Sequence, residues 1–158
     1  SVPRLLDIGV EPYLLSSSLT LVVAQRLIRR ICKNCRESVT PSTRILESIQ
    51  SRTDFSETIE VLQRQGVLRK THDGLAGVRL YKGKGCAQCQ GSGFTGRVGL
   101  FEIFEVDEDI RDLIMQRKPA SFIRSTAIMK GMKTMFQDGL AKAFMGETTI
   151  EEVFRVAL

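Results

Sequence analysis

The sequence predicts an α+β fold, in which a short β-hairpin core is interrupted by a four-cysteine zinc-binding arm and followed by a C-terminal helical bundle. The first observation is a pair of C-x-x-C motifs, Cys32/Cys35 and Cys86/Cys89, which use all four cysteines of the 158 residues. The second is that strand-like patterns flank the motifs, and the third is that only helical patterns follow the second strand. The expected parts are residues 1–31, 32–95 (the arm) and 96–158.

Two helices and a strand are expected before the first motif. Leu5–Val10 places apolar residues at helical spacing, and Gly9 suits a helix end. After a break at Glu11-Pro12, residues 14–23 are predicted to form a helix that is packed on most sides. Residues 23–31 are predicted to form the first strand of the hairpin.

The arm contains two helical patterns in a segment rich in Ser, Thr, Glu, Gln and Arg. These patterns cover residues 42–50 and 56–65, and Gly66 ends the second in the way that a C-terminal glycine usually does. Residues 71–74 are predicted to form a turn, and residues 78–81 a short strand. Large apolar side chains are few here, so we expect metal binding to fold the arm while the strand–helix core keeps its own packing.

After the second motif, residues 97–106 alternate as a strand, with Val98, Leu100 and Phe104 expected to face a core. Helices are predicted throughout the rest of the chain because capping residues and glycines mark their ends. They run from Asp107 to Arg117 and from Pro119 to Gly131, then as two helices separated by Gly146, the last capped by Thr148 or Thr149 with Glu151 and Glu152 in its first turn. The acidic residues of this tail are expected to be helix caps and solvated positions.

Two C-x-x-C motifs are typical of a tetrahedral metal site, because each brings two sulfurs to one ion and two together complete the tetrahedron. Zinc is the expected ion, since it favours thiolates and does not change its redox state. Disulfides or redox dithiols are the alternative, and they are disfavoured because disulfides are rare in cytosolic proteins. With Cys32, Cys35, Cys86 and Cys89 as ligands and no position left for water, the site should be structural, with no catalytic residue in this chain.

The net charge of +5 does not by itself indicate a nucleic-acid partner. Four thiolates and one zinc ion would add about −2, which leaves a mildly basic protein. Basic residues cluster near the motifs, and we interpret them as stabilising the thiolates. Aromatic residues that could stack on bases are few, so no nucleic-acid partner is expected. Neither a signal peptide nor a membrane span is predicted, and free cysteines favour the cytoplasm.

Three further patterns have structural interpretations. Residues 91–96 match G-x-G-x-x-G, but a metal knuckle precedes them and a strand follows, so the glycines should supply positive φ angles and bind no dinucleotide. Residues 86–93 match the C-x-x-C-x-G-x-G repeat of J-domain chaperones in a single copy. His72 is expected to be a turn residue. No G-x-x-x-x-G-K-[ST] motif occurs, so the chain should not hydrolyse a nucleoside triphosphate by itself.

The chain resembles the ATPases of type II secretion and type IV pilus assembly, the general secretory pathway protein E family. The likeness is carried by residues 5–19, 24–27, both C-x-x-C motifs, 95–102, 131–140 and 146–153. It implies that residues 1–31 end an ATPase core and that the chain is a C-terminal fragment of a hexameric, cytoplasmic, ATP- and magnesium-dependent parent. The family's partners are an inner-membrane platform protein and the secretion or pilus machinery, through which the parent would associate with the membrane.

The resemblance leaves alternatives open. Pilus-retraction ATPases resemble the same scaffold but lack the cysteines, so the zinc arm favours the assembly and secretion branch. A zinc-ribbon nucleic-acid-binding module and a chaperone-type zinc domain are the two competing functions. An interaction role without catalysis is the leading one.

Overall fold

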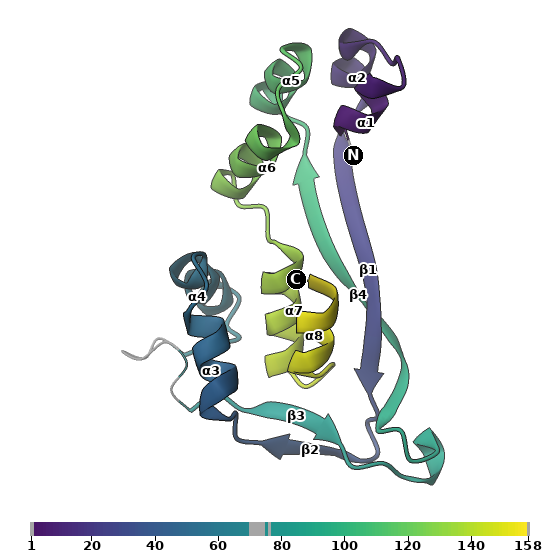
Figure 1. Ribbon diagram of the computed structural model, residues 1–158, viewed down its shortest axis with the longest axis vertical. Helices are drawn as coiled ribbons and strands as arrows, with labels where there is room; N and C mark the ends of the chain where they lie inside the picture. Colours follow the sequence, from purple (N-terminus) through teal and green to yellow (C-terminus); the bar gives the residue numbers. More distant parts are fainter. Residues whose placement is uncertain (1, 70–74, 76, 158) are drawn as a thin grey trace. The chain divides into compact units, whose positions relative to one another are not determined.

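The computed structural model describes residues 2–69, 75 and 77–157, and its fold is mixed helix and strand as predicted (Figure 1). The elements in chain order are α1 (Val2–Asp7), α2 (Pro12–Ser18), β1 (Leu21–Ile31), β2 (Arg36–Val39), α3 (Thr43–Gln50), α4 (Phe55–Arg64), β3 (Leu80–Gly83), the 3-10 turn η1 (Ala87–Cys89), β4 (Phe94–Glu105), α5 (Glu108–Met115), α6 (Ala120–Met129), α7 (Met135–Phe144) and α8 (Ile150–Ala157).

The hairpin of the prediction is formed by β1 and β4, which are hydrogen-bonded neighbours that run in opposite directions (Figure 1). The chain divides into two compact units within these strands. Unit 1 comprises residues 1–25 and 101–134, and unit 2 comprises residues 26–100 and 135–158. Each unit has its own apolar core.

Unit 1 consists of α1, α2, α5, α6 and the adjoining ends of the two strands. Its buried core is aliphatic: Val2, Leu15, Val106, Ile110, Ile114 and Ile123. Helix α2 packs against α5, where the Arg111 Nε donates to the carbonyl of Ser16 at 3.1 Å. Lys130, after α6, forms ion pairs with Asp107 and Asp109, which ties the end of α6 to the start of α5.

Unit 2 contains the arm together with the last two helices. Strand β2 pairs antiparallel with β3, from Arg36 opposite Gly83 to Val39 opposite Leu80. Helix α7 contacts α8, α4 and β3. The aliphatic side chains of the arm share one core with the tail, and the largest fully buried members are Ile28, Ile49, Leu62, Leu100, Leu140, Ile150 and Val153. The arm is therefore richer in buried apolar groups than its polar composition suggests.

Two secondary-structure predictions near the first motif need correction. The helix predicted over residues 14–23 is present but too long, because α2 ends at Ser18 and Leu19 is already extended, with φ −80° and ψ 125°. The β-branched pair Val22–Val23 favours the strand that follows. Strand β2 was not predicted, since its sequence Arg-Glu-Ser-Val lacks an apolar alternation. The turn predicted at 71–74, with His72, lies outside the described residues.

Several helices begin at capping residues, of which Asp107 was predicted. The side chains of Ser42 and Asp107 accept from the backbone N–H three residues ahead, at 3.4 and 3.1 Å. Of the two candidates for the last helix, Thr149 is the cap, because its Oγ1 accepts from the N–H of Glu152 at 3.4 Å. Thr148 donates instead to the carbonyl of Arg29 at 2.9 Å.

Strand β4, the second strand of the hairpin, contributes side chains to both cores. Val98 and Leu100 are buried in the core of unit 2, at 8% and 0% exposure, as predicted. Phe104 is only partly buried and packs on the core of unit 1.

Candidate metal centre

The first cysteine pair is held at the end of β1. The N–H of Cys32 donates to the carbonyl of Gly93 at 2.9 Å, and the carbonyl of Cys35 accepts from the N–H of Lys84 at 3.0 Å. Both partners flank the second pair in the sequence. Backbone hydrogen bonds therefore bring the two motifs together across more than 50 residues, and Cys32 is 1% exposed.

The second cysteine pair forms a tight knuckle around η1. The N–H of Cys86 and the N–H of Gly93 both point at the Cys89 sulfur, at 3.1 and 3.3 Å. Gln90 takes a left-handed conformation at φ 52°, which turns the chain back toward β4. Such N–H groups favour the thiolate form that a metal ligand needs.

Glycine is required where the backbone runs closest to itself. Gly93 has φ +75°, and a Cβ there would lie 2.7 Å from the carbonyl oxygen of Gly83. Gly91 and Gly96 also have positive φ, at 78° and 73°. The prediction that these glycines supply positive φ angles is confirmed. Strand β4 begins at Phe94 and includes Gly96, so the segment opens a strand and not the helix of a dinucleotide fingerprint.

The four sulfurs match the corners of a small tetrahedron. All four cysteines are free of disulfides, and their sulfur atoms lie within 4.8 Å of one another. The Cys32–Cys86, Cys35–Cys89 and Cys86–Cys89 separations are 3.9, 3.8 and 3.7 Å. Zinc–sulfur bonds of about 2.3 Å would place the sulfurs of a tetrahedral site about 3.8 Å apart. The cluster therefore fits one thiolate-bound metal ion.

The thiols differ in how easily they lose a proton. Burial raises the pKa of the Cys89 thiol, but the N–H groups of Cys86 and Gly93 outweigh burial and bring that pKa to about 6. A hydrogen bond with the Thr95 side chain lowers the pKa of Cys32. Burial raises the pKa of Cys35 to about 12. A cation would have to displace the Cys35 proton, so metal binding at this site should depend on pH.

The basic residues near the motifs make other contacts than the sequence suggested. Lys82 and Lys84 form ion pairs with Glu37, at 3.4 and 2.8 Å. Arg36 lies over the Tyr81 ring, and Arg29 lies over the Phe94 ring with its carbon Cζ 4.2 Å from the centroid. Backbone N–H groups, rather than these side chains, contact the Cys89 sulfur.

Glu152 is a residue that the sequence interpretation missed. Its carboxylate was expected to be solvated, yet its side chain is 3% exposed and is bound by Arg29 and Arg155, each at 2.8 Å. Hydrogen bonds from Arg155 lower its pKa to about 2, with Arg29 adding to the effect against burial. An acidic residue three positions after the cap residue Thr149 gives no local signal of this burial, because one of its two partners, Arg29, lies 123 residues away in the sequence.

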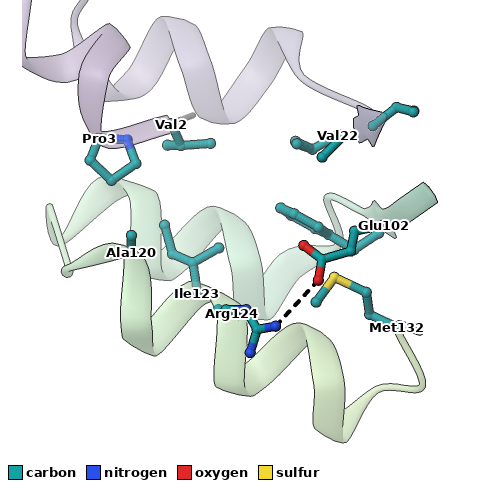
Figure 2. A pocket seen from close by; sticks show the side chains of 11 residues that line it. Val2, Pro3, Val22, Glu102, Ala120, Ile123, Arg124 and Met132 are labelled. Atoms are coloured by element: carbon teal, nitrogen blue, oxygen red, sulfur yellow. Dashed lines mark hydrogen bonds and ion pairs between the residues drawn. The ribbon is translucent and has the colours of Figure 1, made fainter. Parts of the chain in front are cut away.

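Unit 1 contains a cavity that is lined mainly by apolar side chains and no cysteine. The cavity has a volume of about 290 Å³. Figure 2 shows Val2, Pro3, Val22, Ile123 and Met132 among the side chains that line it. The one ion pair drawn at this cavity joins Arg124 to Glu102 at 3.2 Å. Its walls are mainly aliphatic, so the four-cysteine cluster is the stronger candidate for a chemical site.

No helix in the described part of the chain is long and apolar enough to cross a bilayer.

Comparisons with known proteins agree along almost the whole chain. The family model described as type II/IV secretion system protein matches residues 1–155. The chain is 40% identical over 153 residues to the type IV pilus assembly ATPase PilB of Thermus thermophilus, a match that covers 97% of the chain and 15% of that relative. It is 37% identical over 158 residues to the type II secretion system protein E of Dickeya dadantii, covering 99% and 26%.

A third relative is the type II secretion system protein HxcR of Pseudomonas aeruginosa, 33% identical over 156 residues, covering 99% of the chain and 25% of the relative. The chain thus spans between about one seventh and about one quarter of the length of these relatives.

Proposed function

The chain belongs to the type II/IV secretion system protein family, and on that premise we propose that it is a part of a secretion or pilus-assembly ATPase whose four cysteines hold one structural zinc ion. The observation that carries the metal is the tetrahedral spacing of the four sulfurs, which lie within 4.8 Å of one another. Thiolate ligands in this geometry favour zinc over magnesium or calcium, which prefer oxygen.

A structural role fits the ligand set better than a catalytic one. Catalytic zinc sites keep a position for water or substrate, whereas four cysteine thiolates fill the tetrahedron. Cys32, Cys35, Cys86 and Cys89 would hold the ion, and the ion would join the end of β1 to the start of β4. The metal would thereby fix the base of the arm, which carries α3 and α4.

The activity of the whole protein belongs to the same proposal. ATP and magnesium would bind outside these 158 residues, because the sequence lacks a phosphate-binding G-x-x-x-x-G-K-[ST] loop. The parent would act as a cytoplasmic hexamer that meets an inner-membrane platform protein, with this chain providing interaction surface. Relatives named for secretion and for pilus assembly both match, so the choice of branch stays a prediction.

Metal analysis tests the proposal directly. We expect mass spectrometry of the purified protein to find one zinc ion per chain, and the Cys32→Ser/Cys89→Ser double variant to carry none. The wild-type chain should show no ATP hydrolysis above buffer. A metal-free wild-type protein with disulfides at both C-x-x-C pairs would contradict the zinc site, and turnover that survives further purification would contradict the absence of catalysis.

The competing functions have their own tests. A nucleic-acid module would shift oligonucleotides in a salt-dependent way at micromolar protein, and a chaperone-type domain would suppress the aggregation of a client protein. We expect neither result, because the family match spans residues 1–155 and includes the cysteines.

A further inference from the structure

Glu152 is a buried carboxylate, and both of its oxygens accept hydrogen bonds. Its Oε2 accepts from the backbone N–H of Arg29 at 2.9 Å, and its Oε1 accepts from the guanidinium of the same residue at 2.8 Å. Arg155 adds two hydrogen bonds, at 3.1 and 2.8 Å. A buried charge is tolerated only when it is paired and hydrogen-bonded in this way, so Glu152 fixes α8 to β1 at one register.

The residues just before Glu152 bind the same stretch of β1. The Oγ1 of Thr148 donates to the carbonyl of Arg29 at 2.9 Å, and the N–H of Ile31 donates to the carbonyl of Glu147 at 2.9 Å. Thr148 is 0% exposed, so water cannot replace its hydroxyl easily. Arg29 is therefore held at both its N–H and its C=O, and Ile31, directly before Cys32, is held at its N–H.

The same segment also reaches the residue that follows the first knuckle. Arg36, next to Cys35, donates to the carbonyl of Gly146 at 3.1 Å. A Cβ on Gly146 would lie 2.8 Å from the Tyr81 ring, so the three groups are closely packed. Residues 146–152 thus contact the chain on both sides of the first cysteine pair.

Arg29 extends this link to the second knuckle. Its guanidinium lies over the ring of Phe94, the first residue of β4, while its Nη2 donates to the Glu152 carboxylate. The neighbouring carbonyl, that of Gly93, accepts the N–H of Cys32. Fixing Arg29 therefore fixes how the end of β1 lies against the strand that leaves the second cysteine pair.

We propose that residues 146–152, with Glu152 as their charged anchor, are a positioning element of the metal centre that holds the first cysteine pair against the second. This inference rests on the proposed zinc site. A metal binds more tightly when its ligands are already held in place, because less ordering accompanies binding. The C-terminal helix would thus supply supporting contacts to a site whose ligands all lie in the arm.

The test measures zinc affinity by competition with a colorimetric chelator, in the full 158-residue chain. Glu152→Gln keeps the shape of the side chain and removes its charge. We expect zinc affinity to fall about tenfold, the low end of the loss for groups that hydrogen-bond metal ligands directly, because Glu152 acts through Arg29. Glu151→Gln, the exposed neighbour in the same helical turn, is the matched control and should bind zinc like the wild type.

Two more variants separate positioning from general loss of stability. Thr148→Val removes one hydroxyl and keeps the volume, so it should fold even if Glu152→Gln does not, and we expect a loss of about three- to tenfold in affinity. Ile59→Val trims the same core from α4, outside residues 146–152, and should bind zinc like the wild type.

Wild-type affinity in both Glu152→Gln and Thr148→Val would overturn the positioning role while leaving the zinc site standing. A loss in Ile59→Val as large as that in Glu152→Gln would also overturn it, since general stability would then explain both. A wild-type protein that binds no zinc at all would refute the zinc site and this inference together.

Discussion

The two units of the chain are stabilised in different ways. Unit 1 relies on a small aliphatic core and on helix caps. Among the residues that the structure describes, it carries nine of the eleven exposed large hydrophobic side chains: Ile8, Tyr13, Leu14, Leu21, Val23, Ile103, Met115, Phe122 and Met129. Unit 2 holds the four cysteines, the buried Glu152 and the larger core. Removal of the metal or of the buried charge should therefore act on unit 2 and spare unit 1.

The comparison of the two cores also changes which residues are expected to depend on the metal for their order. Ile49 and Leu62 of the arm share a core with Leu140 and Val153 of the tail. If the arm loses its order, these tail residues lose part of their packing. The packing therefore favours joint loss of the arm and helices α7 and α8, whereas the sequence suggested that everything after residue 96 would keep its own packing.

The largest effect is expected from Cys86→Ser. Zinc binding contributes on the order of 10 kcal/mol in small zinc modules, so its loss should reduce amide-exchange protection throughout unit 2, α7 and α8 included. Helices α2 and α5 of unit 1 should stay protected because no cysteine lies in their core. Hydrogen-exchange mass spectrometry of the variant beside the wild type measures both regions at once. Protected α7 and α8 would restore the boundary at residue 96, and loss in unit 1 would remove the distinction between the units.

The second-largest effect is expected from the dependence of stability on Glu152 at low pH. The folded-state pKa of Glu152 is lowered from 4.5 to about 2, so its stabilisation is fully present above the unfolded value and is lost as the pH falls toward 2. A shift of this size corresponds to about 3 kcal/mol. We expect the gap in unfolding free energy between wild type and Glu152→Gln to be largest above pH 5 and to shrink between pH 4.5 and 2.

Urea denaturation at a series of pH values measures that gap. Both proteins release zinc in acid, so the effect of zinc release largely cancels when one unfolding free energy is subtracted from the other. Glu151→Gln, at the exposed neighbouring position, serves as the control and should show a much smaller gap. A gap that does not change with pH would mean that the carboxylate is not the titrating group.

The sequence predicted the parts of this fold that depend on local signals. The paired C-x-x-C spacing predicted that the four cysteines come together, and caps such as Asp107 and Thr149 located helices, because a cap bonds only three residues ahead. Strand β2 could not be predicted from its polar sequence, since its order comes from pairing with β3, more than 40 residues later. Glu152 was missed for the same reason, because its burial depends on Arg29 at the far end of the chain.

The smallest effect comes from a matched pair of helix caps, one in each unit. Asp107 caps α5 in unit 1 and Ser42 caps α3 in unit 2. Replacing either with alanine should lower stability by about 1 kcal/mol, since one backbone N–H loses its acceptor, and Asp107→Ala should be the larger because the Lys130 ion pair is lost as well. Asp107→Ala should weaken exchange protection in α5 and α6 with zinc affinity unchanged. Ser42→Ala should weaken it in the arm and, through the shared core, in α7. If Asp107→Ala also loosens α7, the two units form one cooperative structure, and the separate cores do not define separate stabilities.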